Sequence, residues 1–290
     1  MARQRSEPLC AGESGLPPLG YGDRVPVSHR TVSEGVARIE WDELPAGLSP
    51  AVDAVAAAME AAGADHHRVE VHVDPDDLHA HRVVTWSGMR REGRLRGIAP
   101  GPAGPEDRLV FSRLGDDVPP SEPEGFRALL NSFLPRKRAI AQMLIRDQAG
   151  RVLVCQLTYK KDWDLPGGVV EVGESPQSAV AREVSEELAL AIEAGPLLLT
   201  DWLPAWSGWD DALCLVFDGG EHAAAVLEEI QRDGREIASA DFLTLQQVEE
   251  RCSPITARRV ASALATLAGE GVAYVEGGAG AEDQRASDQT

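Results

Sequence analysis

Three glutamates near the middle of the chain share one face of a predicted helix. Glu183, Glu186 and Glu187 stand three and four positions apart, the spacing that brings side chains together on a helix. Like charges at this spacing disfavour a helix by roughly 0.2–0.5 kcal/mol per pair, and a hard cation would relieve them. Carboxylate oxygens suit Mg²⁺ or Mn²⁺, and bound magnesium usually shares its shell with water and substrate phosphates. The cluster therefore suggests metal-assisted chemistry on a phosphorylated substrate.

The residues around these glutamates predict a helix over 176–190. Ser175 can cap the first turn with its hydroxyl, and Pro176 suits the first helical position. Val180, Val184 and Leu188 repeat every four residues and predict a buried stripe on a different face from the glutamates. A solvated acidic helix face is the alternative interpretation of the three carboxylates, and such faces are common.

A longer pattern distinguishes between these interpretations. It is a glycine, five residues, a glutamate, seven residues, and then Arg-Glu-apolar-x-Glu-Glu-x-Gly-apolar. The chain matches it at Gly168, Glu174, Arg182, Glu183, Val184, Glu186, Glu187 and Leu190. Six of the seven fixed positions match, and chance would give six such matches with odds of about 10⁻⁷ per starting position. The segment resembles the box of the Nudix hydrolase family. Ala189 stands where that family usually has glycine, and we expect it to alter local geometry rather than to remove the metal.

The resemblance covers roughly residues 126–268. It implies an α/β/α sandwich with a mixed sheet, and Mg²⁺- or Mn²⁺-dependent hydrolysis of a nucleoside diphosphate linked to another group. The implied metal ligands are the carboxylates of Glu183, Glu186 and Glu187 and the backbone carbonyl of Gly167. Glu187 is the implied residue that orients or deprotonates the attacking water. The residues implied to support these ligands are Gly168, Glu174 and Arg182.

A second function is compatible with the same fold. The domain could be a nucleotide-sensing or regulatory module that is catalytically weak. The complete set of Glu183, Glu186 and Glu187 argues against it, because a sensor need not keep metal ligands. The nucleotide itself is not specified by the sequence, because specificity in this fold depends on loops around the box.

Two further groups of residues are candidates for substrate binding. Lys160 and Lys161 are two of only three lysines and precede the glycine-rich loop, where they contact phosphate or form a solvated turn. Tryptophans in one predicted loop could stack a nucleobase, form a hydrophobic plug or make a homodimer contact; they are Trp202, Trp206 and Trp209. Glu236 matches a region where many relatives of the family place another glutamate near the metals, and a simple surface charge is the alternative.

Charge and composition restrict the partners. The formal net charge is −19, from 28 basic and 47 acidic side chains. Nucleic acids and anionic membranes attract basic surfaces, so a small-molecule nucleotide is the expected partner. No apolar run is long enough to cross a bilayer and no secretory leader is evident, which predicts a cytoplasmic protein. The scattered cysteines predict buried thiols rather than disulfides at Cys155 and Cys214.

The pattern of apolar residues predicts two domains. We expect a disordered segment at 1–31, a small α/β domain at 32–114, a linker at 115–125, the Nudix-like domain at 126–270 and a flexible tail at 271–290. The first domain has predicted strands at 35–41, 68–73 and 108–114 and predicted helices at 51–62 and 76–87. The second has predicted strands at 138–146, 152–157, 197–203 and 212–217, a predicted glycine-rich strand and loop at 165–173, and predicted helices at 176–190, 245–252 and 255–268.

The small first domain resembles the later half of the GNAT acetyltransferase fold. The resemblance rests on a strand at 68–73, the helix after it, and the sequence Gly88-Met89-Arg90-Arg91-Glu92-Gly93. Asp77, Ala80 and Met89 depart from the residues usual in that family, and no glycine-rich acetyl-CoA loop precedes the helix at 51–62. We therefore expect a degenerate GNAT-like domain that serves substrate selection, dimerisation or partner binding; an active acetyltransferase is the alternative.

Overall fold

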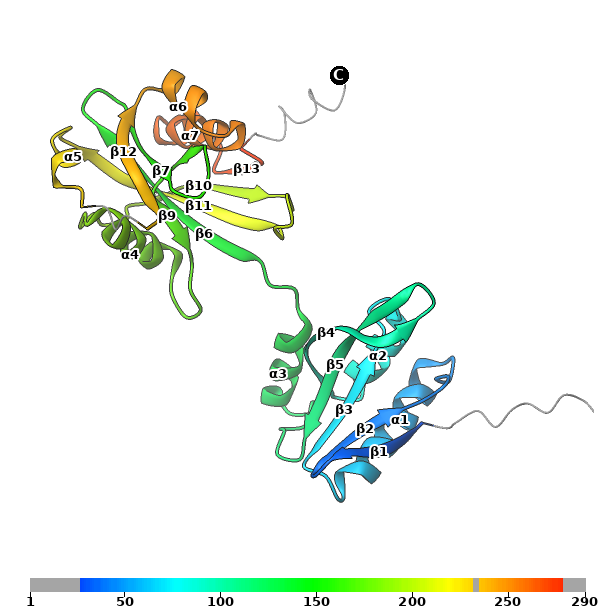
Figure 1. The fold of residues 1–290 in the computed structure, drawn as a ribbon. Helices are drawn as coiled ribbons and strands as arrows, with labels where there is room; N and C mark the ends of the chain where they lie inside the picture. Colours follow the sequence, from blue (N-terminus) through cyan, green and yellow to red (C-terminus); the bar gives the residue numbers. More distant parts are fainter. Residues whose placement is uncertain (1–26, 232–234, 279–290) are drawn as a thin grey trace, which may run out of the picture. The chain divides into compact units, whose positions relative to one another are not determined.

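The chain divides into two compact units, residues 1–135 and 136–290. The computed structural model describes residues 27–231 and 235–278, and Figure 1 labels the helices and strands of each unit. Predicted strands at 68–73, 152–157 and 197–203 coincide with β3 (Arg68–Val73), β7 (Val152–Leu157) and β10 (Leu197–Leu203). Alternation of apolar residues at 68–73, and short apolar runs at 152–157 and 197–203, were therefore sufficient signals for these three strands.

The first unit is a five-stranded sheet with strand order β1-β2-β3-β5-β4. Its other strands are β1 (Ser28–Ser33), β2 (Val36–Glu40), β4 (Arg90–Gly101) and β5 (Gly104–Leu114). Its helices are α1 (Leu48–Gly63), α2 (Leu78–Trp86) and α3 (Pro123–Phe133). Apolar residues from α1, α2 and one face of the sheet form a single core, which includes Val55, Val83, Val71 and Phe111. The unit is therefore a two-layer α/β structure.

The other face of this sheet carries charged side chains. Glu70 lies between the buried Val69 and Val71, and Arg38 lies between Ala37 and Ile39 on the neighbouring strand. Because side chains alternate across a strand, Arg38 and Glu70 share the face opposite the core, where their side chains form an ion pair of 2.7 Å.

Two boundaries of the first unit differ from the sequence predictions. Strand β1 begins at Ser28, inside the segment predicted to be disordered; residues 1–26 of that segment lie outside the described residues. Helix α3 begins in the predicted linker and continues past residue 126. It belongs to the first unit, because Leu129 is buried and the Ser132 hydroxyl accepts a hydrogen bond from the Arg91 amide (3.1 Å).

The second unit is built on a mixed sheet with strand order β12-β7-β6-β11-β10-β13, with β8 paired to β7 and β9 to β6. The strands not yet given are β6 (Arg138–Asp147), β8 (Trp163–Asp164), β9 (Gly167–Val169), β11 (Ala212–His222), β12 (Ile237–Leu243) and β13 (Tyr274–Glu276). The helices are α4 (Pro176–Leu188), α5 (Val226–Glu229), α6 (Leu245–Arg251) and α7 (Pro254–Leu267). Strand β6 is parallel to β11 and antiparallel to β7.

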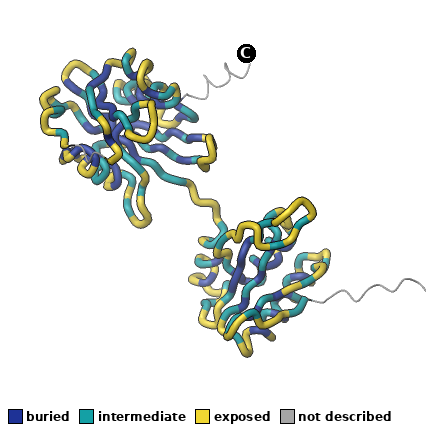
Figure 2. Tube along the Cα trace, in the orientation of Figure 1, coloured by how far each residue is buried: buried dark blue, intermediate teal, exposed yellow. Residues whose placement is uncertain are grey.

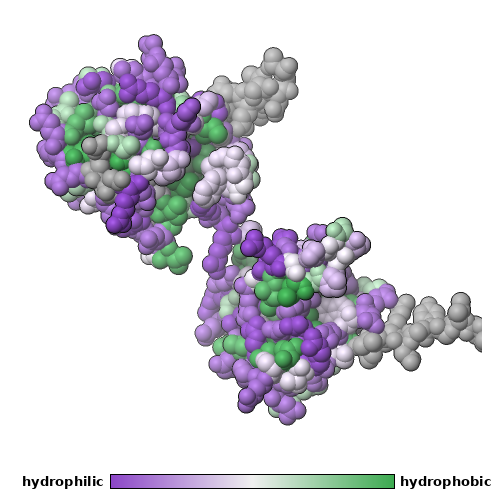
Figure 3. Space-filling view, in the orientation of Figure 1, coloured by the Kyte–Doolittle hydropathy of each residue, from purple (hydrophilic) through white to green (hydrophobic). Residues whose placement is uncertain are grey.

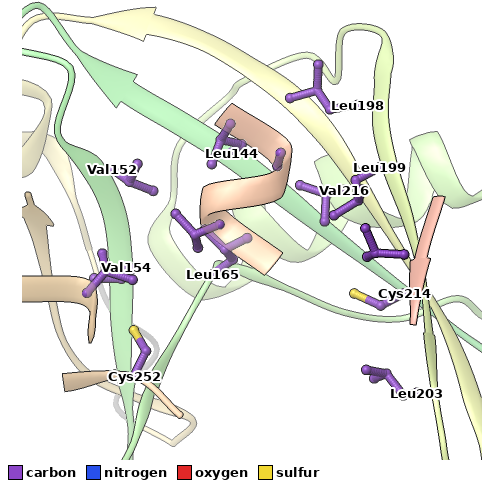
Figure 4. Close-up of a cluster of buried hydrophobic side chains, with 14 of the residues drawn as sticks. Leu144, Val152, Val154, Leu165, Leu198, Leu199, Leu203, Cys214, Val216 and Cys252 are labelled. Carbon is purple, nitrogen blue, oxygen red and sulfur yellow. The ribbon is translucent and has the colours of Figure 1, made fainter. Parts of the chain in front are cut away.

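Helices cover both faces of this sheet. Leu144 of β6 belongs to a cluster with Val260 and Ala263 of α7, and Figure 4 shows part of that cluster. Its neighbours Met143 and Ile145 belong to a second cluster with residues of α4. Successive residues of β6 therefore point to opposite layers, which gives an α/β/α arrangement.

The end of the second unit also differs from its prediction. Strand β13 lies in the predicted flexible tail and pairs in parallel with β10, with Asp201 opposite Val275, which is buried. Residues 279–290 of that tail lie outside the described residues. In Figure 2 the buried residues lie mainly in the central strands and on helix faces, and β1 and β4 contain none; hydrophilic residues cover most of the visible surface in Figure 3.

Two smaller expectations concern membranes and cysteines. No helix in the described ranges is long and apolar enough to span a bilayer. Cys155 and Cys214 are free and buried, as predicted, and so is Cys252. Desolvation raises the pKa of Cys214 to about 11, so this thiol stays protonated at neutral pH.

Candidate active site

Helix α4 carries the three glutamates, and its two ends have well-defined caps. The Ser175 hydroxyl accepts a hydrogen bond from the Ser178 amide (3.1 Å) and caps the first turn. Val180, Val184 and Leu188 are fully buried against the sheet. The helix ends at Leu188, two residues earlier than predicted, because Ala189 adopts a left-handed conformation with φ 57°. A glycine adopts this conformation without strain, which explains the usual glycine of the pattern.

Glu187 lies against strand β9. Its side chain is buried, and its Oε2 accepts a long hydrogen bond from the Gly167 amide (3.4 Å). Gly167 has φ 134°, and a Cβ there would lie 2.2 Å from the Ala141 carbonyl oxygen. Only glycine fits that position, and the tight fit brings the peptide at 167 next to the Glu187 carboxylate.

Glu183 lies against the next glycine. A Cβ on Gly168 would lie 2.6 Å from the Glu183 carboxyl carbon, so the glycine leaves room for this carboxylate. Burial raises the pKa of Glu183, and the nearby carboxylates of Glu186 and Glu236 raise it further, although Arg182 opposes them. The raised pKa means that burial disfavours the ionised form of Glu183, which a nearby divalent cation would favour.

Arg182 ties the loop before the helix to the glutamates. Its Nε and Nη2 donate to the two carboxylate oxygens of Glu174 (3.0 and 3.1 Å). The same guanidinium lies 3.1 Å from Glu183 and 3.0 Å from Glu186. Within the described residues no three acidic, histidine or cysteine side chains converge as a ready metal site. A cation would therefore compete with Arg182 for two of its expected ligands.

The oxygen donors nevertheless fit a hard cation. Glu183 and Glu187 flank the two glycines of β9 from the same helix, and Glu186 is the more exposed of the three, with 61% of its side chain accessible. Three carboxylates and a backbone carbonyl are the donor set that Mg²⁺ and Mn²⁺ prefer. Exposure of Glu186 leaves it able to move from Arg182 toward a cation.

A cavity of about 450 Å³ opens beside this site. Gly167, Gly168 and Glu187 contribute to one wall, whereas Glu183 and Glu186 are not among its lining residues. Trp206 and Trp209 contribute to another wall, and the Arg138 guanidinium lies over both rings at 5.4 and 4.7 Å. Two aromatic rings and an adjacent cation can hold a flat, electron-rich group.

The other predicted binding residues fall in different places. Lys160 lines the cavity, but its ammonium group is paired with Asp164 at 2.7 Å. Trp202 donates its indole N–H to Asp211 (3.2 Å) and, like Lys161, does not line the cavity. Glu236 also lies outside the lining, although its carboxylate is near enough to affect the pKa of Glu183.

Sequence reasoning missed several polar residues of the cavity. They are Arg138, Gln142, Asp164, Thr256 and Arg259. A signal existed for two of them: Gln142 interrupts the apolar run of β6, and Arg259 stands beside Val260 on the buried stripe of α7. A polar residue inside an apolar stripe is usually paired with another buried polar group.

Comparisons with known proteins agree on one domain. Residues 135–264 match the model of the NUDIX domain. A MutT-like protein from Streptomyces ambofaciens is 31% identical over 130 residues, which are 43% of this chain and 75% of the relative.

Solved structures are also similar to part of this chain. A MutT protein from Methanosarcina mazei Go1 is 26% identical with a TM-score of 0.34, over 40% of this chain and 83% of that one. An ADP-ribose pyrophosphatase from Streptococcus suis 89-1591 is 21% identical with a TM-score of 0.36, over 49% of this chain and 99% of that one.

Proposed function

The chain belongs to the Nudix family and is a Nudix hydrolase, and from this premise we propose that it cleaves the phosphoanhydride bond of a nucleoside diphosphate linked to another group. One observation carries the proposal. The predicted ligand Glu187 and the glycines of β9 line the same cavity as two tryptophans and Arg138. A nucleotide site needs two parts: a group that binds phosphate oxygens through a metal ion, and a surface that stacks an aromatic ring.

The metal site of this proposal consists of residues of α4 and β9. Glu183, Glu186, Glu187 and the Gly167 carbonyl would hold Mg²⁺ or Mn²⁺, and Arg182, Glu174 and Gly168 would support them. Such a cation polarises a phosphoryl oxygen and lowers the pKa of bound water. Glu187 is the residue best placed to orient or deprotonate the attacking water, because its carboxylate is fixed beside the Gly167 amide and borders the cavity.

The cavity favours a nucleotide over a more highly charged substrate. Its apolar lining includes Ile140, Leu157 and Leu203 in addition to the two tryptophans. Its cations already have partners: Lys160 pairs with Asp164, Arg259 pairs with Asp201, and Arg138 lies over the tryptophans. A substrate with many phosphates would need several unpaired cations, whereas a nucleoside needs the apolar walls.

The wider setting follows from this function. We propose a small-molecule nucleotide as the partner and the cytoplasm as the compartment, without a role in binding nucleic acid or membranes. The first unit would serve substrate selection, dimerisation or partner binding, and a homodimer remains a prediction.

A panel of nucleoside diphosphate-linked compounds tests the hydrolase. Each compound is incubated with the full chain and Mg²⁺, Mn²⁺ or a chelator, and both products are identified. We expect at least one compound to be cleaved into two products that each end in phosphate, only with a divalent metal. A nucleotide-sensing module without catalysis would bind panel members without product. Cleavage that persists in the chelator would refute the metal site.

A further inference from the structure

A chain of buried polar side chains lies at the floor of the cavity and takes no part in the hydrolytic machinery. Arg259 of α7 donates Nε to Asp201 (2.8 Å) and Nη1 to the Gln142 side-chain oxygen (3.0 Å). Gln142 in turn donates its amide to Asp164 Oδ1 (3.0 Å). One hydrogen-bonded series therefore connects β10, α7, β6 and β8.

Folding alone does not explain this network. Asp201 and Arg259 are 0% and 4% exposed, in a layer that is otherwise mostly apolar. A buried ion pair contributes little net stability, because desolvation of the two charges offsets their attraction. Apolar residues of similar volume would pack the same layer. The presence of charged residues there therefore points to a role in positioning the polar groups of the cavity floor.

The cavity floor presents one hydrogen-bond acceptor, the Asp164 carboxylate, whose partner Lys160 can move away. Asp164 Oδ1 already accepts from Gln142, from the Leu165 amide (3.0 Å) and from the Thr256 hydroxyl (3.3 Å). Asp164 Oδ2 accepts from Lys160, whose side chain is 38% exposed and can turn toward solvent. A ligand that enters the cavity can therefore reach Oδ2 by displacing the lysine, while Oδ1 holds the carboxylate in place.

The charges of the floor also restrict the ligand. Two cations, Arg259 and Lys160, accompany two anions, Asp164 and Asp201. These charges cancel while Lys160 stays in place, and they leave a net negative floor once it turns away, so in neither case would a phosphate there be compensated. An uncharged ring that offers an N–H donor to Asp164 is compatible with the same floor.

The C-terminal strand fixes the far end of the network. The Gly278 amide donates to Asp201 Oδ1 (2.9 Å), and Arg258 donates to the Gly277 carbonyl (2.8 Å). Because Gly278 donates to Oδ1 and Arg259 to Oδ2, both oxygens of the Asp201 carboxylate are occupied. The last described residues of the chain are thus connected to the cavity floor.

We propose that Arg259 and Asp201 are positioning residues for recognition of the uncharged ring of the substrate, which they achieve by holding Gln142 and Asp164 at the floor of the cavity. The inference rests on the proposed function only in that the ligand is a nucleotide. It does not require that the chain cleave that nucleotide.

Equilibrium binding of nucleoside monophosphates tests this inference. AMP, GMP, CMP, UMP and ribose 5-phosphate contain no anhydride bond, so calorimetric titration of the full chain is independent of hydrolysis. We expect at least one monophosphate to bind the wild type about tenfold or more tightly than ribose 5-phosphate. Arg259→Met should bring that ratio close to one, because Asp164 loses its fixed position; a tenfold change is the usual effect of one charge-assisted hydrogen bond.

Two milder variants and one control keep the test decisive if Arg259→Met unfolds. Thr256→Val and Arg259→Lys should each lower the ratio without losing the fold, as checked by thermal melting. Asp218→Asn is the matched control, because Asp218 pairs with Arg146 (3.0 Å) farther along the same β6–β11 strand pair and does not line the cavity. This control should leave the ratio unchanged.

Three results would overturn the inference. In the first, no monophosphate is preferred over ribose 5-phosphate. In the second, folded Thr256→Val and Arg259→Lys keep the wild-type ratio. In the third, the control changes the ratio as much as they do. Selective binding without any hydrolysis would instead sustain this inference and refute the proposed hydrolysis.

Discussion

Each unit contains a network of arginines and carboxylates, and the two networks differ in where they lie. In the first unit Arg68 bridges Glu70 (3.3 Å) and Glu92 (2.6 Å) on the open face of the sheet. In the second unit Arg259 bridges Asp201 and Gln142 below a cavity. Glu92 keeps 43% of its side chain exposed, whereas Asp201 is 0% exposed.

The difference indicates what each network does. On the sheet face water reaches the edge of the network at Glu92, although Glu70 keeps only 12% of its side chain exposed, and such partly solvated ion pairs contribute about 1 kcal/mol or less. Below a cavity the same chemistry is desolvated and contributes little net stability, so its presence there points to a surface that a ligand uses. Hydrogen bonding between charged groups is therefore a weak sign of function by itself, and its position relative to a cavity decides the interpretation.

Removal of one arginine from each network should give the largest difference between the two networks, measured as a loss in the free energy of unfolding. Arg259→Met leaves Asp201 as a buried, unpaired charge, so we expect a loss of about 3–5 kcal/mol in the free energy of unfolding. Arg38→Met on the open face should cost about 1 kcal/mol or less. Chemical denaturation measures both, and equal losses would contradict the distinction between buried and open networks.

One tryptophan from each unit gives a similar comparison for nucleotide binding. Trp209→Ala removes a ring from the cavity wall and should weaken binding of a nucleoside monophosphate by about 1–3 kcal/mol. Trp86→Ala is the control, because Trp86 is exposed on α2 in the first unit. Fluorescence or calorimetric titration of both variants is the measurement. Unchanged affinity of Trp209→Ala would refute the proposal that this tryptophan stacks the ring of the nucleotide.

Two helix ends test whether strain is concentrated beside the glutamates. Ala189→Gly should raise the free energy of unfolding by about 1 kcal/mol, because alanine is strained at φ 57°. Ala268→Gly, at the end of α7 with φ −75°, should give no gain. Urea midpoints measure both variants. A gain at 268 and none at 189 would show that the left-handed residue carries no strain.

The smallest expected effect belongs to Glu70. Burial alone would raise the pKa of Glu70, but the hydrogen bond and charge of Arg38 outweigh it and hold that pKa below its usual value. A lowered folded-state pKa means that the stabilisation is present above the usual carboxyl range and is lost as pH falls through the lowered value. Glu70→Gln should therefore cost about 1 kcal/mol or less at pH 7 and nothing at low pH, and pH-dependent denaturation would detect a cost that instead persists in acid.

Local pattern was enough for much of the fold and for placing the three candidate glutamates on one capped helix. The spacing of Glu183, Glu186 and Glu187 and the cap at Ser175 are properties of one continuous segment. Strand β13 was missed because three residues give no periodicity, and β1 because its sequence is polar.

The floor of the cavity could not be predicted in this way. Arg259 and Gln142 are 117 positions apart, and only the packing of α7 on the sheet brings them together. The polar residues in apolar stripes indicated buried partners without identifying them. Pairings of this kind depend on tertiary structure, which no local pattern contains.

One carboxylate from each unit provides the most direct test of the central claim. Glu187→Gln and Glu70→Gln make the same chemical change, one beside the cavity and one on the open sheet face. The assay uses the best-cleaved compound of the panel and saturating Mg²⁺. We expect Glu187→Gln to lower the rate of product formation by about 10²–10⁴-fold and Glu70→Gln to leave it unchanged. A Glu187→Gln variant that keeps the wild-type rate, or equal losses in both variants, would contradict the assignment of the active site.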